Sequence, residues 1–208
     1  RDDLVTGVQT CALPICRSAA EVQTRREELC RTAYECGLYH DLGKCAVLMY
    51  IDNNARRLLD EEFFCIQSHP RTGADILNRM GCGRTLALAA LYHHCYYNGK
   101  GGYPNDAPSC PPEIKGIVDA LSVADSLDAA TDNIGRCYNL AKPFRTLLEE
   151  LRAQSGTRYA PNVVALFEDE RFCQPRPGPR HWLACWAAAV RPRCRPGGES
   201  SCRRPVRA

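Results

Sequence analysis

The sequence predicts an all-α protein, a bundle of helices interrupted by one long loop rich in glycine and proline. Apolar residues recur every three or four positions in the regular segments, which is the spacing of one helix face. Proline or an acidic residue begins several of these segments and glycine follows some of them, as is typical of helix starts and ends. Every regular segment is predicted to be helical, and there is no internal repeat.

Composition and charge exclude several classes of protein. The chain has 208 residues, of which 45% are hydrophobic and 25% are charged, as in ordinary globular domains. The net charge of +3 is too small to indicate binding to a nucleic-acid polymer. No apolar run is long enough to span a membrane and no signal peptide is visible, so we expect a cytoplasmic protein.

The fourteen cysteines form no C-x-x-C pair, which argues against a zinc ribbon or a redox motif. We expect most of them to be buried free thiols in a reducing compartment.

The two ends of the chain differ in character from the middle. Residues 1–16 show no amphipathic pattern and resemble the conceptual translation of a sequencing adapter. Residues 173–208 are rich in arginine and proline, which indicates either a disordered basic tail or an out-of-frame reading. We therefore predict that the folded domain occupies residues 17–172.

The first predicted helix runs from Thr24 to Lys44 and ends at a histidine–aspartate pair. Its apolar stripe is formed by Leu29, Ala33, Cys36, Gly37 and His40. Asp41 lies beside this stripe, and a buried charge is costly unless it is paired or binds a metal ion. Gly43 is predicted to stop the helix, so that Lys44 projects from its end.

The remaining helices follow from start signals and periodicity. Asp60 is predicted to cap a helix over residues 61–66, and Pro70 to open the next helix, Arg71 to Met80. Further helices are predicted over residues 85–94, 112–131, 143–155 and 161–167. The glycine- and proline-rich loop, residues 95–112, lies between the helices predicted over residues 85–94 and 112–131, and its length suggests a function.

Histidines and aspartates on the apolar stripes or at the helix ends indicate a metal site. The candidates are His40, Asp41, His69, His93, His94 and Asp125. Imidazole and carboxylate ligands together suit Fe, Mn or Zn, and six of them can hold two ions. Two ions generate hydroxide from water and clamp phosphate oxygens, while a lysine nearby neutralises phosphate charge.

Several motifs in this order resemble the HD-GYP subfamily of the HD superfamily of metal-dependent phosphohydrolases. They are His40-Asp41, Ser68-His69-Pro70-Arg71-Thr72-Gly73, His93-His94, Gly102-Tyr103-Pro104, Ala124-Asp125-Ser126-Leu127-Asp128-Ala129 and Ser155-Gly156-Thr157-Arg158-Tyr159-Ala160-Pro161. The resemblance implies an HD-domain helical bundle that hydrolyses the bacterial messenger cyclic di-GMP.

The resemblance also implies roles for single residues. The six candidates named above would be ligands of two divalent ions, Fe or Mn, with Zn, Mg or Ni as alternatives, and Asp41 would bridge them. Lys44 would contact the substrate phosphate or the attacking hydroxide. Tyr103 and Pro104 would shape the substrate loop, and Arg136 and Lys142 would bind phosphate. A homodimer is compatible with this pattern.

The sequence departs from the subfamily pattern at several places. Cys95 stands where a glutamate usually follows the paired histidines, and Asn98 where an aspartate precedes the first loop glycine. The loop has an extra glycine in Gly101-Gly102, and no histidine precedes His40. Two alternatives therefore stand beside the phosphodiesterase hypothesis: a catalytically weak nucleotide-binding module for signalling, and a phosphohydrolase for another phosphate ester.

Overall fold

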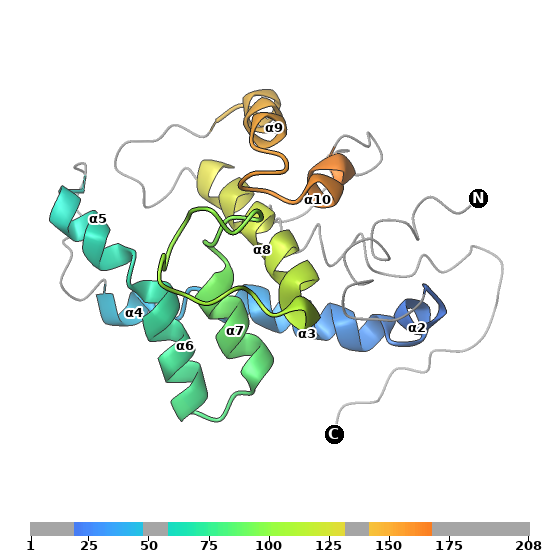
Figure 1. Cartoon of the computed structure of the whole chain (residues 1–208), viewed down its shortest axis with the longest axis horizontal. Helices are drawn as coiled ribbons and strands as arrows, with labels where there is room; N and C mark the ends of the chain where they lie inside the picture. Colours follow the sequence, from blue (N-terminus) through green and yellow to red (C-terminus); the bar gives the residue numbers. More distant parts are fainter. Residues whose placement is uncertain (1–18, 48–57, 132–141, 168–208) are drawn as a thin grey trace, which may run out of the picture.

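The computed structural model describes residues 19–47, 58–131 and 142–167, and within these ranges it confirms an all-α fold (Figure 1). The helices are α2 (Ala19–Thr24), α3 (Arg26–Tyr39), α4 (Lys44–Val47), α5 (Asp60–Ile66), α6 (His69–Arg79), α7 (Arg84–Tyr92), α8 (Pro112–Thr131), α9 (Phe144–Ala153) and α10 (Pro161–Leu166). The described residues form no strand, only two isolated bridges, Cys95 with Gly102 and Ser155 with Tyr159.

The centre of the fold is the packing of α7 against α3, α6 and α8. Small residues on α7 make this close approach possible, because Ala87, Ala89 and Ala90 are all buried. One cluster joins α3 to α7 and α8, and another joins α6 to α7. The histidines that follow α7 are therefore held by helices on several sides.

A second core lies where α9 and α10 cover the C-terminal half of α8 (Figure 1). Its buried side chains are Val123, Leu127, Leu147, Leu151, Tyr159, Ala160, Val163, Val164 and Phe167. The periodic apolar residues predicted for α8 are buried as expected, whereas Asp128 on the same predicted face is exposed. Helix α8 thus connects the two cores, with Ile117 and Leu121 in the first and Val123 and Leu127 in the second.

The predicted helix from Thr24 to Lys44 is wrong at its C-terminal end. Helix α3 ends at Tyr39, residues 40–43 form a turn, and α4 begins at Lys44. Gly43 does not act as a helix stop. A Cβ atom on Gly43 would lie 2.0 Å from the carbonyl oxygen of His69 and 2.6 Å from the amide nitrogen of Gly73. Gly43 is required because the backbone of this turn touches the backbone of α6.

The cysteine prediction is also largely wrong for the described residues. None of the seven described cysteines is in a disulfide, but only Cys36 is buried, whereas Cys45, Cys65 and Cys82 are exposed. The proposed non-native ends, residues 1–16 and 173–208, lie outside the described residues. The predicted domain boundaries therefore stay predictions.

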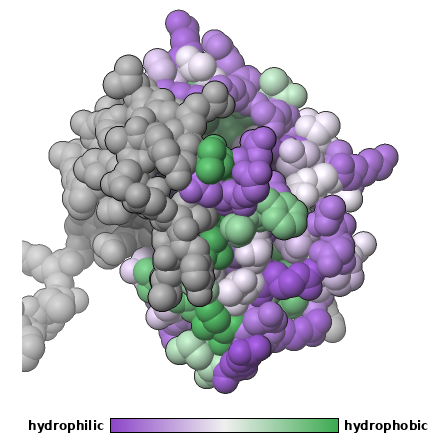
Figure 2. All heavy atoms as spheres, turned by 90° about the vertical axis from the view of Figure 1, so that its left-hand side faces the viewer, coloured by the Kyte–Doolittle hydropathy of each residue, from purple (hydrophilic) through white to green (hydrophobic). Residues whose placement is uncertain are grey.

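The surface on the α4–α5–α6 side is mixed in character. Figure 2 shows hydrophobic residues scattered among hydrophilic ones on the part of this face that is not grey. The exposed large apolar side chains include Phe63 and Phe64 of α5 and Met80 after α6. None of the described helices is long and apolar enough to cross a membrane.

Candidate metal centre

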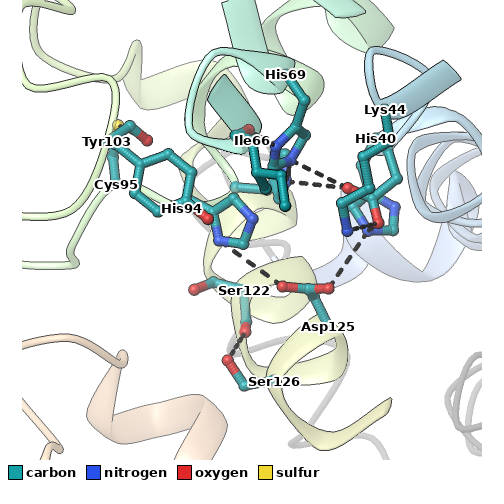
Figure 3. A network of polar contacts seen from close by, with 12 residues as sticks. His40, Lys44, Ile66, His69, His94, Cys95, Tyr103, Ser122, Asp125 and Ser126 are labelled. Carbon is teal, nitrogen blue, oxygen red and sulfur yellow. Dashed lines mark hydrogen bonds and ion pairs between the residues drawn. The ribbon is translucent and has the colours of Figure 1, made fainter. Parts of the chain in front are cut away.

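All six predicted ligands come together in one place, although they are distant in sequence (Figure 3). His40 and Asp41 lie in the turn after α3, and His69 is the first residue of α6. His93 and His94 follow α7, while Asp125 projects from the middle of α8. Helix ends thus supply five of the six, because a helix end can direct a side chain and backbone groups at the same point.

Three of the histidine rings are oriented by the main chain. The distance from Nδ1 to the carbonyl oxygen three residues earlier is 2.8 Å for His40, 2.6 Å for His69 and 2.7 Å for His93. A carbonyl oxygen only accepts hydrogen bonds, so each Nδ1 carries the proton. A ring with this proton alone presents an Nε2 lone pair to the centre, as metal-binding histidines do.

The two fully buried rings place closely spaced acceptor atoms at the centre. The Nε2 atoms of His69 and His93 lie 3.1 Å apart, so two lone pairs face each other when both Nδ1 atoms are protonated. Nε2 of His40 and Oδ1 of Asp41 are also buried, and neither has a hydrogen-bond partner among the described residues. Unpaired buried acceptors are costly, and a metal ion would satisfy all of them.

The donor atoms form two groups that share one carboxylate. Asp41, His69, His93 and His94 form the first group, and His40, Asp41 and Asp125 form the second, with donor atoms within 4.8 Å of one another in each. Oδ1 of Asp41 lies 3.1 Å from Nε2 of His69, and Oδ2 lies 3.4 Å from Nε2 of His40. Each oxygen of Asp41 thus faces a different group. The cluster is consistent with an HD metal site.

For the two carboxylates and for the rings of His93 and His94, the electrostatics favour the protonation state of a ligand. Burial alone would raise the pKa of Asp41 and of Asp125, but the neighbouring histidines outweigh it and hold both pKa values well below the ordinary range. Burial lowers the pKa of His93 and His94. At neutral pH the carboxylates are therefore charged and these two rings are neutral, as metal binding requires.

Lys44 is bound directly to the shared carboxylate. Its Nζ donates to Oδ2 of Asp41 at 2.5 Å, and its side chain keeps 29% of its surface exposed. A charge-assisted bond of this kind is stronger than a neutral one. Lys44 therefore fixes the orientation of Asp41 and still reaches solvent beside the cluster.

Tyr103 in the loop covers the paired histidines from outside. Its ring centroid is 4.4 Å from that of His94 and 6.1 Å from that of His69. The thiol of Cys95, which lies beside Tyr103 in Figure 3, donates to the carbonyl oxygens of Tyr103 and Pro104, at 3.7 and 3.9 Å. Burial raises the pKa of Cys95 to about 11, so the thiol stays protonated. Cys95 therefore supports the loop and is in neither donor group.

The other departures from the subfamily pattern preserve the shape of the loop. Oδ1 of Asn98 accepts from the backbone nitrogen of Lys100 at 2.9 Å, a bond that an aspartate oxygen could also accept. Gly102 has φ +83°, and a Cβ there would lie 2.0 Å from the carbonyl oxygen of His94. A Cβ on Gly101 would lie 2.6 Å from the ring of Tyr96, so the extra glycine makes room for that ring.

Of the two predicted basic residues after α8, the structure describes only Lys142. Arg136 lies outside the described residues. Nζ of Lys142 donates to both carboxylate oxygens of Glu150, at 2.7 and 2.9 Å, and its backbone nitrogen donates to Ala130. The described contacts of Lys142 therefore join α8 to α9, and its role in phosphate binding stays a prediction.

Sequence reasoning missed a connection behind Asp125. The hydroxyl of Tyr159 donates to Oγ of Ser126 at 3.0 Å, and Ser126 donates to the carbonyl oxygen of Ser122. Both residues belong to recognised motifs, but no spacing rule predicts that the two motifs touch. The contact joins the turn before α10 to the helix that carries Asp125.

Comparisons with known proteins agree with this geometry. Residues 2–163 match the HD domain. The chain is 33% identical over 130 residues to a cyclic di-GMP phosphodiesterase of Thermotoga maritima, covering 62% of this chain and 34% of that protein. It is 33% identical over 148 residues to a cyclic di-GMP phosphodiesterase of Pseudomonas aeruginosa, covering 69% of this chain and 34% of that protein.

A relative named for a different substrate is similar to the same degree. The chain is 33% identical over 131 residues to the 3′3′-cGAMP-specific phosphodiesterase 2 of Vibrio cholerae, covering 61% of this chain and 24% of that protein. The matched part of this chain spans about a third or less of the length of these three relatives.

Proposed function

The chain belongs to the HD domain family, and on that premise we propose that it is a metal-dependent phosphodiesterase acting on cyclic di-GMP or a related nucleotide phosphodiester. The observation that carries the proposal is the pair of donor groups that share Asp41, with Lys44 bound to the same carboxylate. The names of the similar proteins support a cyclic dinucleotide as the substrate class.

The donor set fits two divalent ions, Fe or Mn in the first place, with Zn, Mg or Ni as alternatives. When bound, such ions lower the pKa of water and neutralise charge on phosphate oxygens. The Nε2 atoms of His40, His69 and His93 would hold them together with His94, Asp41 and Asp125. The carbonyl contacts at Nδ1 fix three of these rings before any ion arrives.

Residues around the ligands would handle the substrate. Lys44 would place its positive charge against a phosphate oxygen or the attacking hydroxide while it keeps Asp41 in position. Tyr103 would exclude water from the side of His94, and Pro104 would set the course of the loop behind it. Together they would align a phosphodiester with the centre and limit other nucleophiles.

The test is hydrolysis by the full chain, purified without chelator and without oxygen and loaded with Mn or Fe. We expect cyclic di-GMP to be converted to the linear dinucleotide, measured by chromatography, with about two metal ions per chain by elemental analysis. A protein that holds two ions and leaves the whole panel of cyclic dinucleotides unchanged would contradict the proposal.

Two observations define the alternatives that the same panel separates. Similarity to a 3′3′-cGAMP-specific enzyme favours that nucleotide as a second candidate substrate. The substitutions at Cys95 and Asn98 favour a binding module, which would show saturable binding of cyclic dinucleotide without turnover. Turnover of a simple phosphate ester alone would indicate a phosphohydrolase of different specificity.

A further inference from the structure

The turn between α9 and α10 is attached to the loop that covers the metal centre. The backbone nitrogen of Tyr97 donates to the carbonyl oxygen of Arg158 at 3.0 Å, and that of Asn98 donates to Thr157 at 3.1 Å. Within the turn, the nitrogen of Gly156 donates to the carbonyl oxygen of Tyr159 at 2.8 Å. Arg158 therefore sits on a backbone that is fixed to the loop.

The same turn is attached to the helix that carries a candidate ligand. Tyr159, next to Arg158, donates its hydroxyl to Ser126, and Ser126 follows Asp125 on α8. Arg158 is thus placed between the loop segment that positions Tyr103 over His94 and the helix that positions Asp125. Both attachments involve bonds of about 3 Å that do not depend on the guanidinium itself.

The guanidinium of Arg158 lies among tyrosine rings and has no anionic partner. Its central carbon is 5.1 Å from the ring centroid of Tyr159 and 5.9 Å from that of Tyr96. Burial raises the pKa of Tyr103 and the charge of Arg158 opposes this rise, so the guanidinium lies within electrostatic reach of the ring over His94. Across the described part of the chain, no carboxylate and no hydrogen-bond acceptor is paired with it.

The half-buried guanidinium of Arg158 has N–H donors without an acceptor, and a ligand with acceptor oxygens would satisfy them. Stacking on tyrosine uses the face of the guanidinium and leaves its five N–H groups at the edge. Phosphate oxygens match that edge in a two-pronged arrangement that lysine cannot reproduce. The tyrosine rings hold the fork in place, so little side-chain freedom is lost on binding.

We propose that Arg158 binds a phosphate group of the substrate at the rim of the metal centre, as a specificity residue for dinucleotides. The inference rests on the proposed function and names the substrate contact that the sequence had assigned to Arg136 and Lys142. A cyclic dinucleotide carries two phosphates. One is held at the metal centre and the other lies against Arg158, whereas a simple phosphate ester uses the metal centre alone.

The experiment compares Arg158→Gln with Arg158→Lys and with Arg79→Gln, an exposed charge at the end of α6. Binding of a hydrolysis-resistant cyclic di-GMP analogue to the metal-loaded full chain is measured by calorimetry, because one phosphate is held at the metal centre. Arg158→Gln should raise Kd on the order of 10- to 100-fold, the loss of hydrogen bonds to a charged group. Arg158→Lys should give an intermediate value, and Arg79→Gln the wild-type value.

Steady-state kinetics of the Mn-loaded proteins distinguish loss of a phosphate contact at Arg158 from general damage to the fold. Arg158→Gln should raise KM for cyclic di-GMP and leave kcat and metal content close to wild type. The inference is overturned if Arg158→Gln binds as tightly as Arg79→Gln, if the wild type binds no cyclic di-GMP, or if the loss comes with lost metal. Wild-type binding that depends on Arg158 without turnover would instead contradict the proposed function and support this contact.

Discussion

The donor cluster and the loop over it are built in different ways. The cluster uses buried side chains at helix ends, and three of its rings are fixed by main-chain carbonyl groups. The loop, residues 95–111, is held by a few backbone bonds, the thiol of Cys95 and one exposed ion pair. The departures at Cys95, Asn98 and Gly101 fall in the loop. The buried donor cluster is constrained at many points, whereas the loop is held at few points and tolerates change.

The difference has a physical cause. In the buried cluster, a lost donor leaves other donors or charges without a partner and without water. In the loop, water can replace most lost contacts, so a substitution there changes position more than stability. Substitutions in the cluster should therefore reduce activity more than substitutions in the loop, and only those in the cluster should lower the metal content.

Asp41→Asn should have the largest effect, because it removes charge from the only residue common to both donor groups. We expect a loss of activity on the order of 1,000-fold or more, comparable to losing a main electrostatic group in an active site. Metal content, measured by elemental analysis, should fall as well. Asp128→Asn, the same change on an exposed position of α8, should alter neither; equal effects of both variants would contradict a shared ligand.

Gly43→Ala should disrupt the cluster without touching a ligand. The new Cβ would meet the backbone of His69 at 2.0 Å, so α6 or the turn must move. We expect a loss of about 2–3 kcal/mol in the free energy of unfolding, measured with urea, together with weaker metal binding. In the control, Gly81→Ala, the Cβ enters open space at φ +69° and should cost only about 1–2 kcal/mol. Equal costs would show that the contact with α6 yields easily.

The two regions also differ in how far the sequence predicts them. Periodicity and start signals predict α8 to the residue, and the motif spacing selects all six residues of the cluster. The same reasoning gives Gly43 the wrong role, that of a helix stop. A glycine is required there because the backbone of the turn touches the backbone of α6, and no local sequence pattern reveals the position of α6. The apolar periodicity favours a helix that continues to Lys44, but the contact between the turn and α6 prevails.

The loop was predictable only as a loop. Its glycine and proline content indicates irregular structure, but the bonds from Tyr97 and Asn98 to the turn before α10 join segments about 60 residues apart. In the sequence, Cys95 stands where the subfamily usually has a glutamate. In the structure, its thiol donates to carbonyl groups of the loop. Such long-range contacts depend on tertiary packing, which composition and periodicity do not encode.

Lys44→Met should distinguish a substrate role from a purely structural one. If Lys44 contacts the reacting phosphate, kcat should fall by about 10- to 100-fold, the value of hydrogen bonds to a charged group. Metal content should stay near wild type, because Lys44 is not in either donor group. Lys44→Arg should recover part of the rate. A variant that loses metal and rate together would show that Lys44 acts only by orienting Asp41.

Cys95 tests how much support the loop needs. Cys95→Ser keeps a donor toward the carbonyl oxygens of Tyr103 and Pro104, so KM should stay within about threefold of wild type. Cys95→Val removes the donor and should raise KM by about fivefold, the equivalent of about 1 kcal/mol. Steady-state kinetics with the Mn-loaded protein measures both. A large fall in kcat for Cys95→Ser would place Cys95 with the cluster instead of the loop.

The ion pair between Arg71 and Asp106 should have the smallest effect, although it is the one ion pair that joins the loop to α6 among the described residues. Nη2 of Arg71 lies 2.6 Å from Oδ1 of Asp106, but the side chains are 50% and 71% exposed. Exposed pairs contribute about 0–1 kcal/mol and weaken with salt. A double-mutant cycle with Arg71→Ala and Asp106→Ala should therefore give a coupling below about 1 kcal/mol in KM, and less at high salt. A larger coupling that persists at high salt would mean that the substrate desolvates the pair, and the loop would then be as tightly constrained as the cluster when substrate is bound.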